Sequence, residues 1–196
     1  LKGPMDIVYR DLINAIDAEF IPFWEAKEAR ERKDTRYVCL RHDVDHDMLK
    51  ALDMGKHEFS FPVPSTYFLL HTAEYFQPES TGFRMMLNFL QQFGHWFGLH
   101  HNALGEEIRE GVDPNLSFPV AIDFLREWQS QLYASAHGDK KVKELGLTNW
   151  MVWSEHWMIT KKVNAGPCVS MESQKIENEV YFMDWDYCWS DSGRKW

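Results

Sequence analysis

The sequence predicts an α/β fold in which buried parallel strands alternate with helices. Three observations support this class: short apolar runs alternate with amphipathic stretches, polar clusters follow several of the runs, and 44% of the 196 residues are hydrophobic. Parallel strands have helices on both faces, so their sequences are nearly continuous apolar runs. The pattern is typical of an α/β barrel or an open sheet, in which reactive residues gather at the carboxyl ends of strands.

Length and composition fit one domain. A chain of 196 residues with 15% aromatic content can bury a sizeable core. No internal repeat, low-complexity tract or linker rich in Pro, Gly and Ser divides it. Residues 1–4, ahead of Met5, look like the remnant of a protease site, so the expected domain is residues 5–196.

The charge indicates which classes of binding partner to expect, and the cysteine content indicates the cellular compartment. The formal net charge of −9 and the pI of about 5.4 argue against nucleic acid and anionic membrane surfaces, which favour a basic face. No apolar run has the length of a transmembrane span and no basic-then-apolar leader is present, so we expect a cytoplasmic protein. The three cysteines lack CxxC spacing, which indicates a reduced compartment. Cys39, inside an apolar run, is expected to be a core residue.

The first half of the chain is expected to form a helix, a strand and a second helix. Apolar residues at helical spacing before Pro22 and a charged stretch after it predict a helix at residues 11–32. The apolar run at residues 37–40 predicts a buried strand. Asp47 can cap the next helix. The apolar stripe of that helix consists of Met48, Ala51, Leu52, Gly55 and Phe59.

The rest of the chain continues this alternation. The elements are a strand at residues 66–70, a helix at 83–93, a strand at 96–99, a helix at 121–132 and a strand at 133–136. Between the strand at residues 96–99 and the helix at residues 121–132, we expect a loop rich in Gly, Asp and Pro. Beyond Trp150 the pattern weakens, although residues 151–153 and 180–183 could each be a strand.

A polar cluster, which we call the acidic motif, directly follows the predicted strand at residues 37–40. Residues 41–47 read Arg-His-Asp-Val-Asp-His-Asp, which places two carboxylates one residue apart between imidazoles. His100 and His137 follow two later strands, so three strand ends could bring their side chains to one rim. Zinc and related ions take His nitrogen and carboxylate oxygen, and catalytic sites leave one position open. One Asp and two His would complete such a site, and the other Asp could take a proton, which predicts metal-assisted hydrolysis.

In combination and order, four segments resemble the polysaccharide deacetylases of carbohydrate esterase family four, the NodB-homology group. The resemblance is to a short branch with an HDVD first motif, associated with bacterial surface-polysaccharide gene clusters. Residues 39–45 (CLRHDVD) match its first motif, and residues 65–69 (STYFL) match its second strand. Residues 94–100 (GHWFGLH) are similar to its GHEIGLH segment, and residues 190–193 (SDSG) to a stretch near its end. The match covers about residues 36–138 and this late piece.

The resemblance implies a distorted, incomplete (β/α) barrel of about seven units. It implies one divalent metal, with Zn²⁺ as the expected ion. The implied reaction removes an N- or O-acetyl group from a sugar or sugar nucleotide in bacterial surface-polysaccharide (O-antigen) biosynthesis. Position by position, Asp43 would be the general base, and Asp45 and His100 would be metal ligands.

The chain departs from the family at three points. Leu104, which cannot coordinate, stands where the family has its second histidine ligand, so His137 is the expected replacement. Trp96 replaces the usual Glu, and the sequence ends at Trp196, before an expected strand with a catalytic-acid histidine. These departures leave open a catalytically impaired, deacetylase-like protein that binds carbohydrate.

Four further residues are candidates for contacting the sugar, namely His101, Asn102, Asp191 and Ser192. Each has an alternative interpretation that needs no substrate. His101 could equally be an exposed residue, and Asp191 and Ser192 could form a turn before Gly193.

Two other classes of site are excluded by residues near the acidic motif. A phosphatase of the haloacid dehalogenase type needs Thr or Val two residues after its second Asp, where Asp47 stands, and has no use for His100. A calcium loop of the EF-hand type needs Gly at its sixth and Glu at its twelfth position. Counted from Asp43, these positions are Met48 and Met54.

Overall fold

The structure, a computed structural model, consists of helices and parallel strands in two units of the chain. It describes residues 4–29, 31–32, 36–129, 132–149 and 169–170. The units are residues 1–100 and 101–196, and the boundary lies within one strand, Trp96–His101. The mixed α/β class predicted from the sequence is confirmed. A barrel of seven units is not shown by the residues that the structure describes.

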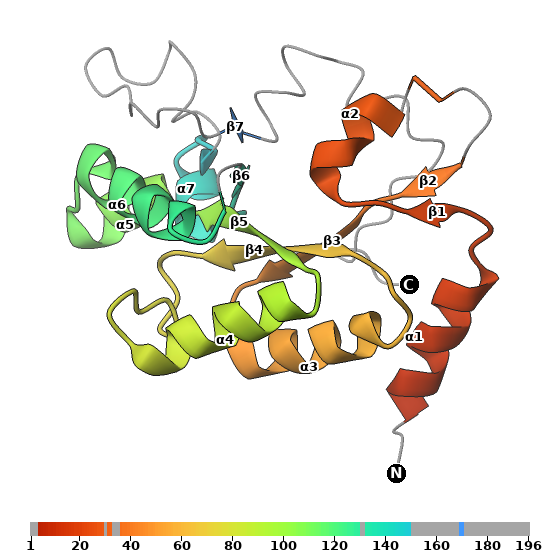
Figure 1. Ribbon diagram of the computed structural model, residues 1–196. Coiled ribbons are helices and arrows are strands. Elements are labelled where there is room, and N and C mark those ends of the chain that lie inside the picture. Colours follow the sequence, from red (N-terminus) through yellow and green to blue (C-terminus); the bar gives the residue numbers. More distant parts are fainter. Residues whose placement is uncertain (1–3, 30, 33–35, 130–131, 150–168, 171–196) are drawn as a thin grey trace. The chain divides into compact units, whose positions relative to one another are not determined.

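The first unit contains the strands around the acidic motif and the helices that pack on them (Figure 1). Its elements are α1 (Pro4–Ala15), β1 (Glu19–Phe20), η1 (Phe23–Glu25), α2 (Ala26–Ala29), β2 (Tyr37–Val38), β3 (Leu40–Val44), α3 (Met48–Phe59), β4 (Ser65–Leu70), α4 (Thr81–Gln92) and β5 (Trp96–His101). Strands β3, β4 and β5 pair in parallel, as an α/β fold requires. The strand predicted at residues 37–40 is divided between β2 and β3, with Cys39 between them.

The single helix expected at residues 11–32 is wrong, because the helix ends at Ala15 and an extended segment follows. Strand β1 pairs in parallel with β2, and the amide of Ile21 donates to Val38 O at 3.0 Å. Pro22 disfavours helical geometry at the residue before it, and Ile21 is almost fully buried. Strand pairing and burial therefore override the helical spacing of the apolar residues.

Strand β4 lies at the centre of the first unit, and all of its residues are buried. It pairs with β3 on one side and β5 on the other. Helices α3 and α4 lie side by side over one face of these strands (Figure 1). A strand in this position needs apolar side chains on both faces, which explains the continuous apolar run that predicted it.

Helix α3 begins at the predicted cap but turns an unexpected residue toward the sheet near its end. Asp47 accepts hydrogen bonds from the amides of Leu49 and Lys50, which confirms it as the N-cap. Phe59, expected in the apolar stripe, is 56% exposed, whereas Glu58 is fully buried. Four members of the predicted apolar stripe are buried, and Phe59 is not among them. Glu58 takes the buried position because it meets several hydrogen-bond donors there.

The second unit continues from the end of β5. Its elements are α5 (Ala103–Glu110), α6 (Pro114–Arg126), β6 (Tyr133–Ala136), α7 (Lys140–Glu144) and β7 (Val169–Ser170). Strand β6 has the predicted bounds and is parallel to β7. It follows β5 in the strand order, and the amide of His137, one residue beyond β6, donates to His101 O at 2.8 Å.

Two helices of the second unit differ from expectation. Helix α5 occupies a segment expected to be a loop, and the residues of its first turn are buried. Helix α6 begins and ends earlier than the helix predicted at residues 121–132. The strands expected at residues 151–153 and 180–183 lie outside the described residues. Every helix in the described part of the chain is too short or too polar to traverse a bilayer.

Candidate metal centre

Strand β3 turns the carboxylates of the acidic motif and a neighbouring imidazole to opposite faces. Successive side chains of a strand point to opposite sides, so Arg41 and Asp43 share one face and His42 lies on the other. Asp45, directly after the strand, continues the face of Asp43. The two faces of this short strand therefore have different chemistry.

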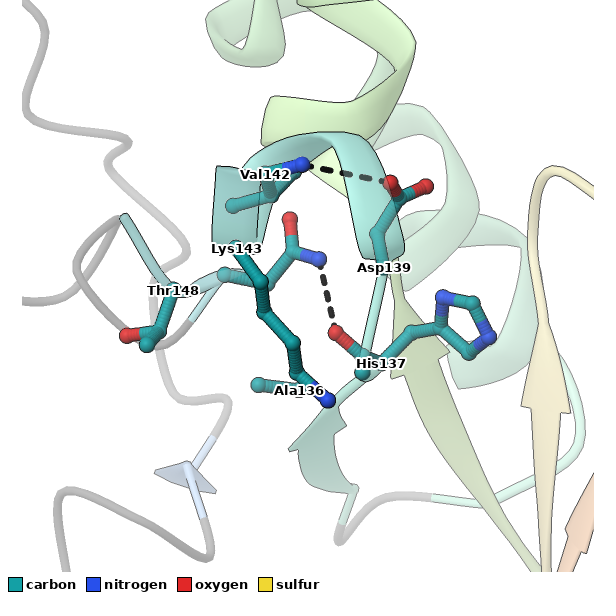
Figure 2. A pocket seen from close by; sticks show the side chains of 8 residues that line it. Ala136, His137, Asp139, Val142, Lys143 and Thr148 are labelled. Atoms are coloured by element: carbon teal, nitrogen blue, oxygen red, sulfur yellow. Dashed lines mark hydrogen bonds between the residues drawn. The ribbon is translucent and has the colours of Figure 1, made fainter. Parts of the chain in front are cut away.

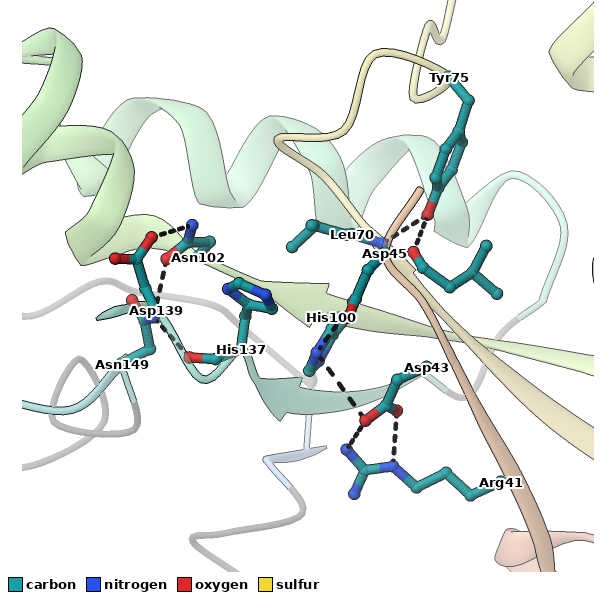
Figure 3. A network of polar contacts seen from close by, with 11 residues as sticks. Arg41, Asp43, Asp45, Leu70, Tyr75, His100, Asn102, His137, Asp139 and Asn149 are labelled. Atoms are coloured by element: carbon teal, nitrogen blue, oxygen red, sulfur yellow. Dashed lines mark hydrogen bonds and ion pairs between the residues drawn. The ribbon is translucent and has the colours of Figure 1, made fainter. Parts of the chain in front are cut away.

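Asp45 and His100 lie close together because of the strand register (Figure 3). Leu70 pairs with His100, and Val44 pairs with the residue before Leu70. Asp45, one residue beyond Val44, is therefore level with His100 at the carboxyl ends of the strands. His100 Nε2 lies 3.5 Å from Asp45 Oδ1 and 3.9 Å from Asp43 Oδ2. The structure thus brings together three of the predicted site residues in the first unit.

The spacing of Asp45 and His100 fits two ligands of one ion. Asp45 Oδ1 is buried and accepts no hydrogen bond from any residue that the structure describes. Its distance of 3.5 Å from His100 Nε2 is too long for a charge-assisted hydrogen bond, which measures about 2.7–2.9 Å. Two ligand atoms at about 2.1 Å from a tetrahedral zinc ion stand about 3.4 Å apart. The donor types and their spacing therefore suit a divalent metal.

Asp43 is oriented by the arginine two residues before it (Figure 3). Arg41 donates from Nε to Asp43 Oδ1 at 2.8 Å and from Nη2 to Oδ2 at 3.0 Å. Its guanidinium carbon also lies 4.7 Å from the centre of the Phe68 ring. That ring approaches Gly98 so closely that a Cβ there would lie 2.4 Å from it. Gly98 therefore leaves room for the stack that supports Arg41 and, through it, Asp43.

Tyr75 joins the carboxyl ends of β3 and β4. Its hydroxyl accepts a hydrogen bond from the Leu70 amide at 2.8 Å and donates to the Val44 carbonyl. Burial raises the pKa of Tyr75, so the hydroxyl stays protonated and can make both bonds. The backbone just before Asp45 is fixed in this way. Sequence reasoning missed Tyr75, because a single tyrosine in a loop has no periodic signal.

On the opposite face of β3, a buried carboxylate receives four hydrogen bonds. Glu58 Oε1 lies 2.5 Å from Tyr9 Oη and 2.5 Å from His42 Nε2. Glu58 Oε2 accepts from Ser65 Oγ at 2.7 Å and from Tyr67 Oη at 2.6 Å. Burial alone would raise the pKa of Glu58, but the bonds from His42 and the tyrosines outweigh it and hold the pKa at about 2. This Glu58 network fixes His42, the chain neighbour of Asp43.

Sequence reasoning also missed Glu58, although a signal for it exists. Glu58 follows Gly55 by three residues on the apolar face of α3. A charged residue at a core position of a helix requires buried partners, because an isolated charge is costly to remove from water. Strand β4 supplies two such partners, Ser65 and Tyr67.

Glu58→Gln is expected to lower the free energy of unfolding by about 3 kcal/mol at pH 7, because the amide cannot replace a buried carboxylate that receives four hydrogen bonds. The folded-state pKa of about 2 lies below the ordinary value of 4.5. This contribution is therefore complete above pH 4.5 and is lost as the pH falls toward 2. Urea unfolding of both proteins between neutral pH and pH 3 measures the difference, which should shrink on acidification.

Asp53→Asn is the matched control, since Asp53 is an exposed carboxylate on the same helix with one ion-pair partner, Lys56. It should change stability little at any pH. Equal pH dependence in the Glu58→Gln protein and the wild type would show that Glu58 is not the linked group.

His137, the predicted third ligand, belongs to the second unit. Its amide is bonded to His101 O, and its carbonyl accepts a hydrogen bond from Asn149 at 2.8 Å. Asp45 and His100 in the first unit, with His137 in the second, offer the carboxylate and imidazole donors of a possible metal-binding triad. Zinc is bound by these donor types.

The two candidate substrate residues at the end of β5, His101 and Asn102, are interior residues of the second unit. His101 is fully buried, and its ring packs edge-on against Phe118 with ring centres 5.0 Å apart. The alternative that His101 is exposed is therefore wrong. Asn102 is also buried, within a polar network. Substrate contact by these residues stays a prediction, and Asp191 and Ser192 lie outside the described residues.

A hollow of about 140 Å³ lies beside His137 within the second unit (Figure 2). It is lined by Ala136, His137, Gly138, Asp139, Val142, Lys143, Thr148 and Asn149. Figure 2 shows the His137 imidazole directed away from it. The hollow is therefore separate from the ligand atoms of this histidine.

Cys39 lacks the character of a reactive thiol. Burial, and secondarily the charge of Glu25, raise its pKa to about 12. A thiol with this pKa is protonated at neutral pH, whereas the nucleophilic form is the thiolate. Cys39 is half-buried, so the expectation that it is a core residue is met only in part.

The chain matches no protein-family model, no curated protein and no solved structure. The geometry of Asp43, Asp45 and His100 is therefore the main support for a function. The resemblance to the deacetylases rests on the sequence motifs alone.

Proposed function

We propose that this protein is a metal-dependent hydrolase that removes an acetyl group from an N- or O-acetylated sugar. The main support is the pair of Asp45 Oδ1 and His100 Nε2, which lie 3.5 Å apart. Asp45 Oδ1 is buried and has no hydrogen bond within the described part of the chain. Asp43 lies on the same face, with Oδ2 3.9 Å from that nitrogen. Metal-assisted hydrolysis uses such a set, in which some groups hold the ion and another moves a proton.

The proposed ligands are Asp45, His100 and His137, with Zn²⁺ as the expected ion. Support for His137 comes from chain connectivity within the second unit. His101 directly follows His100, and its carbonyl accepts the amide hydrogen of His137 at 2.8 Å. Leu104 has no donor atom and is fully buried. A bound divalent ion would lower the pKa of water and polarise the acetyl carbonyl.

The proton of the attacking water would be taken up by a side chain of β3. Asp43 is the proposed general base, which takes a proton from the attacking water. Arg41 holds both oxygens of this carboxylate, so the water must share or replace one of these hydrogen bonds. His42, fixed by Glu58, supports the same strand from its other face. The base would thus act from a defined position.

The proposed substrate class follows from the resemblance to the short HDVD branch of the polysaccharide deacetylases. It is an acetylated sugar or sugar nucleotide of bacterial surface-polysaccharide (O-antigen) biosynthesis. A second candidate function is carbohydrate binding without catalysis. The Arg41 bonds to both oxygens of Asp43 favour it, because they compete with a proton acceptor role.

One experiment separates these functions. The purified protein is analysed for bound metal and incubated with N-acetylated and O-acetylated sugars and sugar nucleotides, and released acetate is measured. Metal together with acetate release supports the hydrolase. Sugar binding without release, with or without metal, supports the binding protein, whereas a protein that takes up no metal contradicts the hydrolase.

His137→Ala is expected to weaken metal binding far more than His101→Ala. Neighbouring residues of a strand point to opposite faces, so His101 is directed away from the face of His100, and its ring packs on Phe118. Calorimetric titration of Zn²⁺ into the metal-free proteins measures both affinities. Thermal unfolding must accompany it, since His101→Ala removes a buried ring. A larger loss of affinity in folded His101→Ala protein would make His137 a structural residue.

A further inference from the structure

Asn149 forms hydrogen bonds to both of the segments that follow β5 and β6 (Figure 3). Its Oδ1 accepts a hydrogen bond from the Leu104 amide at 3.0 Å. Its Nδ2 donates to Asn102 Oδ1 and to His137 O, each at 2.8 Å. Both amide hydrogens are therefore used. The residue is 1% exposed, so water does not compete for these bonds.

Asp139 completes the same network. Its Oδ2 accepts from Asn102 Nδ2 at 2.9 Å and from Arg109. Its Oδ1 caps α7 by accepting from the Lys141 amide at 2.8 Å. Burial alone would raise the pKa of Asp139, but the hydrogen bonds from Asn102 and Arg109 outweigh it and hold the pKa at about 2. The network is tightly packed, because a Cβ on Gly105 would lie 2.2 Å from Asn102 Oδ1.

His137 is held on both sides of its Cα by these contacts. Its amide donates to His101 O at 2.8 Å, and its carbonyl accepts from Asn149 at 2.8 Å. The imidazole therefore projects from a backbone position that is fixed before any ion binds. A preorganised ligand loses little conformational freedom on binding, which favours the bound state.

We propose that Asn149 is a positioning residue that holds His137 ready to bind a metal ion. This inference rests on the proposed metal centre. The hydrogen bond from Asn149 goes to the backbone carbonyl of His137, so Asn149 would act through this ligand and not on the ion. Hydrogen bonds that orient metal ligands contribute about 10–100-fold to metal affinity. Loss of the Asn149 bond should cost a comparable factor.

Two variants test this role. Asn149→Asp keeps the shape and the bond from Leu104 but cannot donate to His137, while Asn149→Ser is neutral and too short to reach it. Co²⁺ alone is titrated into the metal-free, full-length proteins, and its visible absorption reports both affinity and coordination geometry. Both variants should bind Co²⁺ about 10–100-fold more weakly, with an altered spectrum. Zn²⁺ calorimetry should give the same order of affinities.

Ser80→Ala is the control, because it removes the side-chain cap of α4, where Ser80 Oγ accepts a hydrogen bond from the Phe83 amide at 3.4 Å. It should lower folding stability without changing the affinity for Co²⁺ or the spectrum. In the His137→Ala background, Asn149→Ser should have no further effect on affinity, since the ligand that it positions is gone.

Equal losses with and without His137, or wild-type affinity in a folded Asn149 variant, overturn the positioning role and leave the metal centre intact. If the wild-type protein takes up neither Co²⁺ nor Zn²⁺, the metal centre itself is refuted and the positioning role with it. These two failures are therefore distinguishable.

Discussion

Asp43→Asn is expected to keep the metal but to lower the rate of acetate release by a factor on the order of 10²–10⁴, the usual contribution of a general base. The amide has the shape of the carboxylate but cannot take a proton from water. It also retains one oxygen for the bond that Arg41 donates, so the strand should keep its form. Steady-state rates with an acetylated sugar substrate and the metal content of both proteins measure the two parts of this prediction.

Asp47→Asn is the matched control for Asp43→Asn. It makes the same chemical change four residues along, where the side chain caps α3. Asparagine caps helices about as well as aspartate, so activity and stability should both be retained. Equal activity of the Asp43→Asn protein and this control would remove Asp43 from the mechanism.

Asp45→Ala and His100→Ala are each expected to lower metal affinity by more than about 100-fold, beyond the usual cost of losing only a supporting hydrogen bond. Each removes a donor atom of the pair that lies 3.5 Å apart. With either donor gone, fewer protein ligands remain than a catalytic zinc site normally has. Elemental analysis after dialysis, followed by Zn²⁺ titration, measures the loss.

His46→Ala serves as the control for these two variants, since His46 is an exposed imidazole directly after Asp45. It should leave the affinity for metal unchanged. Full metal occupancy in both the Asp45→Ala and His100→Ala proteins would refute the assignment of the ligands, whatever the behaviour of His46.

Patterns of local chemistry predicted the part of the site that lies on strands. The apolar runs that became β4 and β5 were predicted correctly, whereas β3 lies mostly within the polar motif that was expected to follow its strand. The register of these three strands makes Asp45 and His100 neighbours. Asp47 was predictable as a cap because capping depends on a few adjacent residues. His137 could be named because it directly follows an apolar run that became β6.

The hydrogen-bond networks around the candidate site join residues that are far apart in the sequence. A local sequence pattern cannot predict such contacts. Glu58 meets Tyr9, which is 49 positions away along the chain. Asn149 meets Asn102, which is 47 positions away. The expected helix at residues 11–32 failed for a related reason, since pairing of β1 with β2 is a tertiary contact. Helical spacing describes one segment only and cannot report such partners.

The Glu58 network also has a consequence for how β3 aligns with its neighbours. A slip of one residue would turn every side chain of the strand to the other face. A slip in one of the two directions would place Asp43 instead of His42 opposite Glu58, and two carboxylates would face each other in a buried space. Such a pair is strongly disfavoured unless one of the two is protonated. This misaligned form of the sheet is thus penalised during folding, before the protein meets any ion.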